Sequence, residues 1–209
     1  MYYFTNESLE AIIAGLEPKS DDLVLAVCGS GDQAFALLEF GCQIITTDQN
    51  PQQIYHAKNN YKLLKNKQFL EFVNLNVSEE FLDDERYLAR ENYFQQNSYL
   101  NKISNNLNQL SFFPGNIFKK IPEKMFSKIY LSNVFNYNFM EIEEQKQSFK
   151  NLSSKLKNNG LIYVSQGIFL PEQTQHSFFN SLYINERLTI KARKLEKYWN
   201  PVIYKKSIN

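Results

Sequence analysis

Two segments of the chain carry glycines and carboxylates at a spacing that suits a ribose-containing ligand. The first, Cys28-Gly-Ser-Gly-Asp32, directly follows the apolar run Leu23 to Val27. The second ends in Asp48, about 17 residues after the second glycine, which is near the spacing of the ribose-binding acid in nucleotide-binding βαβ units. Glycines at such a turn allow a sharp bend and a close approach of the backbone to a ligand. The pattern therefore predicts a pocket for an adenosine-containing cofactor.

A strand, a helix and a second strand must position these residues. The run Leu23 to Val27 is typical of a parallel strand that is covered on both faces. Residues 33–40 carry apolar side chains at helical spacing, and Gly41 stands where a glycine often ends a helix. After the second strand, Asn50-Pro51 opens another helix, because proline is tolerated in the first turn.

The type of cofactor follows from what the glycine turn lacks. A dinucleotide site usually has a third glycine, in the pattern G-x-G-x-x-G, but Gln33 and Ala34 follow Asp32 here. Asp32 at the start of a helix would also repel a pyrophosphate. S-adenosylmethionine has no phosphate and carries positively charged groups, so we expect it as the cofactor. The alternatives are a structural turn, a non-catalytic S-adenosylmethionine-binding protein and an NAD(P)-dependent oxidoreductase.

The second half of the chain predicts more strands of a mostly parallel sheet. Strands are expected at Lys128 to Asn133 and Leu161 to Ser165, with a helix over Glu143 to Leu156 between them. Two more strands, Tyr183 to Lys191 and Pro201 to Lys205, would form an antiparallel pair at the C-terminal edge.

Residues 66–110 form a stretch too long for an ordinary connection in a compact α/β domain. We interpret it as an inserted helical lid or substrate-recognition region within a single domain over 1–209. The alternative is a helical addition without contact to substrate, because surface loops tolerate insertions.

The order of these elements resembles the Rossmann-like class I S-adenosylmethionine-dependent transferase fold. Residues 24–34, 47–53 and 129–137 are similar to motifs of the diacylglycerol 3-amino-3-carboxypropyl transferase family of betaine-lipid synthesis. The resemblance implies transfer of a methyl or a 3-amino-3-carboxypropyl group to a small-molecule or lipid-like acceptor.

This resemblance and the predicted fold assign roles in cofactor binding. The backbone from Cys28 to Gly31 would cradle the methionine part, and Asp32 would hold its ammonium group directly or through water. Asp48 would accept both ribose hydroxyls, or would instead cap the next helix. The expected cofactor-binding residues are Cys28, Gly29, Ser30, Gly31, Asp32, Asp48, Gln49, Asn50, Asn116 and Asn133, with Gln49, Asn50 and Asn116 beside the adenine.

Two residues are expected near the reacting centre. Asn133 follows a strand and would point toward it, while Tyr137 would shape the acceptor pocket or help remove a proton. Asn116 and Asn133 could instead be turn residues, and Tyr137 could serve packing. An in-line displacement needs no protein nucleophile, and the sequence has no recognised nucleophile motif.

Composition narrows the class of protein. A chain of 209 residues suits one domain, and its net charge of +1 offers no electrostatic case for a nucleic-acid partner. Cys28 and Cys42 are expected to be buried thiols, with no metal site. The sequence has no signal-like start and no apolar segment that reaches ~18 residues, so we expect a cytoplasmic protein without a membrane span.

Overall fold

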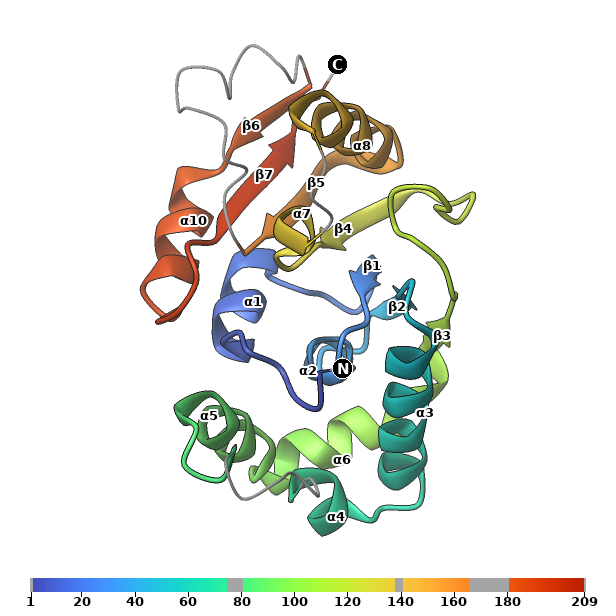
Figure 1. Ribbon diagram of the computed structural model, residues 1–209, viewed down its shortest axis with the longest axis vertical. Helices are drawn as coiled ribbons and strands as arrows, with labels where there is room; N and C mark the ends of the chain where they lie inside the picture. The colour runs from blue at the N-terminus through green and yellow to red at the C-terminus, as the bar shows by residue number, and fades with distance from the viewer. Residues whose placement is uncertain (1, 75–80, 138–140, 166–180, 209) are drawn as a thin grey trace.

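The computed structural model describes residues 2–74, 81–137, 141–165 and 181–208. Within these ranges seven strands form one sheet in the order β3-β2-β1-β4-β5-β7-β6 (Figure 1). Neighbouring strands from β3 to β5 pair in parallel, whereas β7 is antiparallel to both β5 and β6. The strands are β1 (Leu23–Val27), β2 (Gln43–Thr47), β3 (Leu110–Phe112), β4 (Phe126–Tyr130), β5 (Leu156–Val164), β6 (Leu182–Ile184) and β7 (Val202–Lys206). The predicted α/β fold, with a mostly parallel sheet and an antiparallel C-terminal edge, is confirmed.

Helices cover both faces of the sheet because successive side chains of β1 point to opposite sides. Val24 and Ala26 belong to a core shared with α1 (Leu9–Leu16), α2 (Asp32–Leu38) and α10 (Glu186–Arg193). Leu25, between them, belongs to the core on the opposite face, which includes apolar residues of α8 (Ile142–Ser154). The sheet is therefore buried on both sides, and a ligand can reach the strands only at their ends.

In the described part of the segment between α3 (Pro51–Lys65) and β3 there are three α-helices, drawn in green near the lower end of Figure 1. They are α4 (Phe69–Val73), α5 (Glu85–Phe94) and α6 (Asn97–Asn105). Phe72 of α4 contacts Phe35 of α2 and Phe94 of α5 with ring centroids 5.7 and 4.9 Å apart. These helices are thus part of the main core. Their role as a lid or a substrate-recognition region remains a prediction.

The predicted strand from Tyr183 to Lys191 is wrong beyond β6. The side chain of Asn185 accepts a hydrogen bond from the backbone N–H of Leu188 (3.1 Å) and caps α10, which starts at Glu186. The buried residues Leu188 and Ala192 then follow at helical spacing. The helix cap at Asn185 therefore ends the strand earlier than predicted.

The helix expected over Glu143 to Leu156 also ends early, at Ser154, and Leu156 already belongs to β5. Asn159, with φ +61°, introduces an irregularity early in that strand. No helix in the described ranges combines the length and apolar character that a membrane crossing requires.

Candidate functional site

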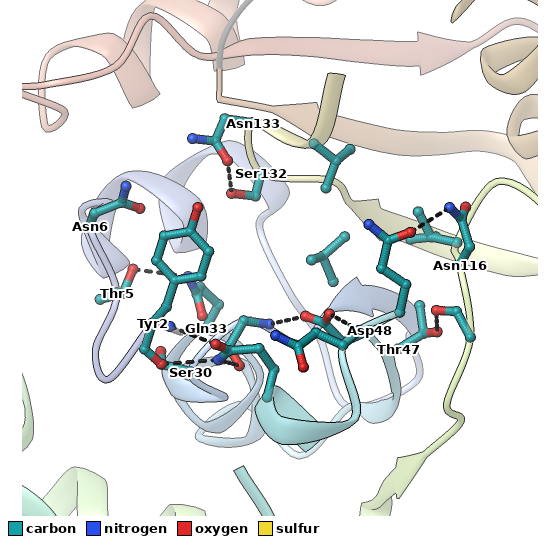
Figure 2. Close-up of a pocket in the computed structure, with 18 of the residues that line it drawn as sticks. Tyr2, Thr5, Asn6, Ser30, Gln33, Thr47, Asp48, Asn116, Ser132 and Asn133 are labelled. Atoms are coloured by element: carbon teal, nitrogen blue, oxygen red, sulfur yellow. Dashed lines mark hydrogen bonds between the residues drawn. The ribbon is translucent and has the colours of Figure 1, made fainter. Parts of the chain in front are cut away.

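A cavity of about 280 Å³ lies at the carboxyl ends of β1, β2 and β4 (Figure 2). These three strands are neighbours in the sheet, so the polar residues that follow them lie together at one edge. Val27 of β1 pairs with Thr47 of β2, and both line the cavity. The loop after β3 and the N-terminal residues complete the wall. Ligands of open α/β sheets typically bind at this edge.

The two glycines of the turn after β1 have different tasks. Gly29 lines the cavity with φ +48°, and a Cβ there would meet no atom within 4 Å. Gly31 does not line the cavity; at φ +91°, its Cβ would lie 2.9 Å from the ring of Phe35 and 3.0 Å from the Cβ of Ala57. At Gly29 the cavity wall therefore consists of backbone without a side chain. Gly31 allows α2 and α3 to pack closely.

This difference predicts unequal effects of two matched substitutions. Gly29→Ala should cost about 1–2 kcal/mol, because only the left-handed backbone is strained. Gly31→Ala should cost roughly 1–3 kcal/mol more, because it also overpacks the core. Urea denaturation of both variants measures the two free energies of unfolding. A loss for Gly29→Ala that equals or exceeds the loss for Gly31→Ala would contradict this assignment.

Asp48 stands at the end of β2 with its carboxylate on the cavity wall. One oxygen accepts from the backbone N–H of Gly29 (3.1 Å) and the other from that of Asn50 (2.9 Å). Burial raises the pKa of Asp48 above its ordinary value, and these two N–H groups oppose the rise. Each carboxylate oxygen retains a second lone pair. The group can therefore accept from two neighbouring hydroxyls, as a ribose presents them.

Asn50 and Asn116 both line the cavity and also stabilise local turns. The side chain of Asn50 caps α3 by accepting from the N–H of Gln52 (2.9 Å). Asn116 accepts from the N–H of Phe118 (2.8 Å) and donates to the Oε1 of Gln49 (2.8 Å). The fold thus brings Asn116 beside Gln49 at one end of the cavity, although 67 residues separate them.

Asp32, which was expected to hold the ammonium group of the cofactor directly or through water, is not among the residues that line the cavity. Its side chain is fully buried, and one carboxylate oxygen lies 3.1 Å from the Nε of Arg90 in α5. The other oxygen accepts from the N–H of Thr5 (2.9 Å) and the hydroxyl of Ser30 (2.9 Å). Asp32 instead joins the glycine turn, the N-terminus and the inserted helices.

Cys28 also lies behind the wall, whereas its neighbours Gly29 and Ser30 line the cavity. The Cys28 side chain packs with Ile54 and Ala57 of α3, and burial raises the pKa of its thiol to about 12. Its carbonyl accepts from the N–H of Gly31 (2.8 Å) and closes the turn. Cys28 therefore shapes the turn, and its backbone contact with the methionine part of the cofactor stays a prediction.

Residues 2–6, which we call the strap, form a wall of the cavity that sequence reasoning missed. Thr5 and Asn6 line the cavity, just before Ser8, which caps α1. Gln53 of α3 holds the strap: its Nε2 donates to the carbonyls of Gly29 (2.7 Å) and Tyr2 (3.0 Å). No local motif marks the strap, because its contacts come from residues distant in the sequence.

Gln33 was not assigned to the site, yet it lines the cavity (Figure 2). Its Nε2 donates to the hydroxyl of Thr5 (2.9 Å), while its buried Oε1 has no partner among the described residues. A buried acceptor without a donor is costly. A ligand that carries an N–H donor would satisfy it.

The end of β4 contributes Ser132 and the buried Asn133 to the cavity wall, and the position of Asn133 near the reacting centre stays a prediction. Ser132 has a left-handed backbone (φ +56°), and its hydroxyl lies 3.2 Å from the Oδ1 of Asn133. The same hydroxyl donates to the carboxylate of Glu7, and Ser165 donates to the other oxygen of that carboxylate. Tyr137 ends α7 (Val134–Tyr137), and its side chain lies outside the described part of the structure.

The burial of Glu7 predicts a stability that depends on pH. Burial raises the pKa of this carboxyl from its ordinary 4.5 to about 7. The folded chain then binds the proton more tightly than the unfolded chain, so this contribution is fully present below pH 4.5 and is lost as the pH rises toward 7. Between pH 5 and pH 8 the loss amounts to roughly 2–3 kcal/mol.

Urea unfolding at pH 5 and pH 8 measures this loss. The wild-type chain should lose more stability over this interval than Glu7→Gln, because the amide does not titrate. Equal pH dependence in the two proteins would show that Glu7 keeps the same pKa on folding.

No protein-family model matches the sequence, and no curated protein matches it. Among solved structures, the chain is similar to the N-methyltransferase NodS from Bradyrhizobium japonicum WM9 (TM-score 0.57, 9% identity, 96% of this chain and 94% of that chain). It is also similar to a ribosomal protein L11 methylase from Lactobacillus delbrueckii subsp. bulgaricus (TM-score 0.56, 16% identity, 96% and 79%). A third is a TehB-like SAM-dependent methyltransferase from Corynebacterium glutamicum (TM-score 0.55, 14% identity, 96% and 88%). The chain therefore has the Rossmann-like fold of class I methyltransferases.

Proposed function

We propose that this protein is an S-adenosylmethionine-dependent transferase that acts on a small-molecule or lipid-like acceptor. The observation that carries the proposal is the position of Asp48. Its carboxylate stands at the end of β2, beside the bare backbone of Gly29, on the wall of a cavity in a methyltransferase fold. This is the edge at which such sheets bind nucleosides.

The residues of the cavity suit the chemistry of this cofactor. Asp48 would hold the ribose, and Gln49 and Asn116 would border the adenine. The unpartnered Oε1 of Gln33 offers an acceptor for the ammonium group, the task first assigned to Asp32. When bound, the cofactor supplies a carbon made electrophilic by the adjacent sulfonium.

The chain's own contribution to the reaction is orientation and exclusion of water. An in-line displacement gains most of its rate from proximity and alignment. The strap and the loop after β3 border the cavity on two sides, and Asn133 offers an amide at the end of β4 for orienting an acceptor. Tyr137 remains the proposed residue for shaping the acceptor pocket.

Two observations favour two different transferred groups. The methyltransferases of similar fold favour methyl transfer. The motifs at 47–53 and 129–137 favour transfer of a 3-amino-3-carboxypropyl group, because they resemble those of the diacylglycerol-modifying family. Mass spectrometry of the nucleoside product distinguishes them: methyl transfer leaves S-adenosylhomocysteine, and aminocarboxypropyl transfer leaves methylthioadenosine.

A dinucleotide-dependent oxidoreductase is less compatible with the sheet. The usual dinucleotide-binding order is 3-2-1-4-5-6, whereas here the antiparallel β7 lies between β5 and β6. The argument that Asp32 repels a pyrophosphate carries less weight, because Arg90 neutralises this carboxylate.

Calorimetric titration tests the proposal with four ligands: S-adenosylmethionine, S-adenosylhomocysteine, NAD and NADP. We expect the two sulfur nucleosides to bind and the two dinucleotides not to bind. Binding of a dinucleotide alone would overturn the proposal. Binding without turnover, when S-adenosylmethionine is offered with cell extracts, would favour the non-catalytic alternative.

A further inference from the structure

Glu7 lies directly behind the cavity wall, although it does not line the cavity itself. Its side chain is 5% exposed, and it reaches the cavity only through the hydroxyl of Ser132, which is part of the wall. Ser165, at the end of β5, donates to the second oxygen of the carboxylate. The hydroxyl of Ser132 thus connects a buried carboxyl group to the end of the cavity where Asn133 lies.

The groups that face Glu7 are acidic or neutral. The phenols of Tyr130 in β4 and Tyr163 in β5 lie close to it, and Glu196, after α10, adds a second negative charge. The pKa values of both phenols are far above 10, so they stay neutral. Within the described ranges no lysine, arginine or histidine forms a salt bridge with Glu7.

A buried carboxylate without a cation is unfavourable, so the group is partly protonated near neutral pH. Its pKa of about 7 expresses this balance. A cation placed nearby would favour the ionised form.

The proton of Ser132 has two competing acceptors, Glu7 and the Oδ1 of Asn133. A hydroxyl has one proton to donate. When Glu7 is protonated it can donate to Ser132, which then donates to Asn133. When Glu7 is ionised, Ser132 turns toward it and leaves the Oδ1 of Asn133 open to a ligand. The charge of Glu7 is therefore linked to the polar surface of the cavity.

We propose that Glu7 is the counter-ion of a cationic ligand group at the Ser132–Asn133 end of the cavity, and that it releases its proton when this group binds. This inference rests on the proposed function, because S-adenosylmethionine carries such a group in its sulfonium.

The sheet order supports this location. Asp48 would hold the ribose at the end of β2, on one side of β1, whereas Ser132 and Asn133 follow β4 on the other side. In Figure 2, Asn116 and Asn133 lie at separate ends of the cavity, and Asp48 lies below and between them.

The test compares two ligands that differ only in the methyl group and its positive charge. Binding enthalpies of S-adenosylmethionine and S-adenosylhomocysteine are measured at pH 7 in buffers of different ionisation enthalpy, which gives the number of protons released. We expect the wild-type chain to release about half a proton more than the Glu7→Gln variant when each binds S-adenosylmethionine. S-adenosylhomocysteine should show no such difference, and the titration of the ligands' own groups cancels between the two proteins.

The affinity gives a second readout. From pH 8 to pH 6 the Kd of S-adenosylmethionine should rise about tenfold more in the wild-type chain than in Glu7→Gln. Glu10→Gln, which removes an exposed carboxylate of α1, is the matched control and should behave like the wild type.

Equal proton release by the two ligands from the wild-type chain overturns the inference without any variant, so a Glu7→Gln protein that fails to fold does not block the test. Unchanged proton release in a folded Glu7→Gln protein overturns it as well. If both ligands bind but release the same number of protons, only this inference fails. If neither ligand binds, the proposed function fails with it.

Discussion

Replacing Arg90 with methionine should lower the free energy of unfolding by about 3–5 kcal/mol, the largest effect that we expect from a single substitution. The guanidinium is fully buried and lies 3.1 Å from the carboxylate of Asp32. It also donates to the backbone carbonyls of Phe72 (2.9 Å) and Val73 (2.8 Å) in α4. Arg90→Met leaves all three acceptors without this donor, and it leaves the negative charge of Asp32 unpaired in the core.

The same helix provides a matched control. Arg86 pairs with Asp84 at the protein surface, with 42% of its side chain exposed, so Arg86→Met should cost less than ~1 kcal/mol. The double variant Arg90→Met/Asp32→Asn should regain part of the loss, because it removes the stranded charge. Urea denaturation at pH 7 measures all three. Similar losses for Arg90→Met and Arg86→Met would show that the buried pair does not connect the inserted helices to the glycine turn.

Replacing Asp48 with alanine should weaken the binding of S-adenosylhomocysteine roughly 30- to 100-fold, which corresponds to about 2–3 kcal/mol. The carboxylate would otherwise accept from both ribose hydroxyls, and hydrogen bonds to a charged group are among the stronger ones. The fold should survive, because Asp48 is only half-buried at the rim of the sheet. Isothermal titration calorimetry measures the affinity, and thermal unfolding checks the fold.

Two further variants refine this prediction. Asp48→Asn keeps one acceptor and should show an intermediate loss of affinity. Asp21→Ala removes an exposed carboxylate outside the cavity and should bind like the wild type. An unchanged affinity in Asp48→Ala would show that this residue does not hold the ribose, even if the cavity binds the nucleoside.

The βαβ unit and the position of Asp48 on the cavity wall could be predicted from the sequence, because local rules specify them. An apolar run that leads into a glycine turn predicts a buried strand. The carboxyl end of the neighbouring parallel strand must then lie beside the glycine turn. Asp48 and Gly29 meet for this reason, and their hydrogen bond follows from the register of β1 and β2.

Local patterns failed where a distant contact decides the outcome. A strand was predicted through Lys191, but packing of Leu188 and Ala192 against the core makes the segment a helix. Asp32 looked like a ligand residue from its place after the glycines. Only the fold reveals that Arg90, 58 residues further along, neutralises it.

The place of the pocket follows from the sequence, because the strand, the glycine turn and Asp48 belong to one βαβ unit. The packing of distant elements fixes which other residues surround that pocket. The strap, Gln33 and Glu7 reach it through contacts that span up to 125 residues, as between Glu7 and Ser132. Such contacts leave no periodic signal, since they depend on how the elements pack and not on the order of side chains within any one of them.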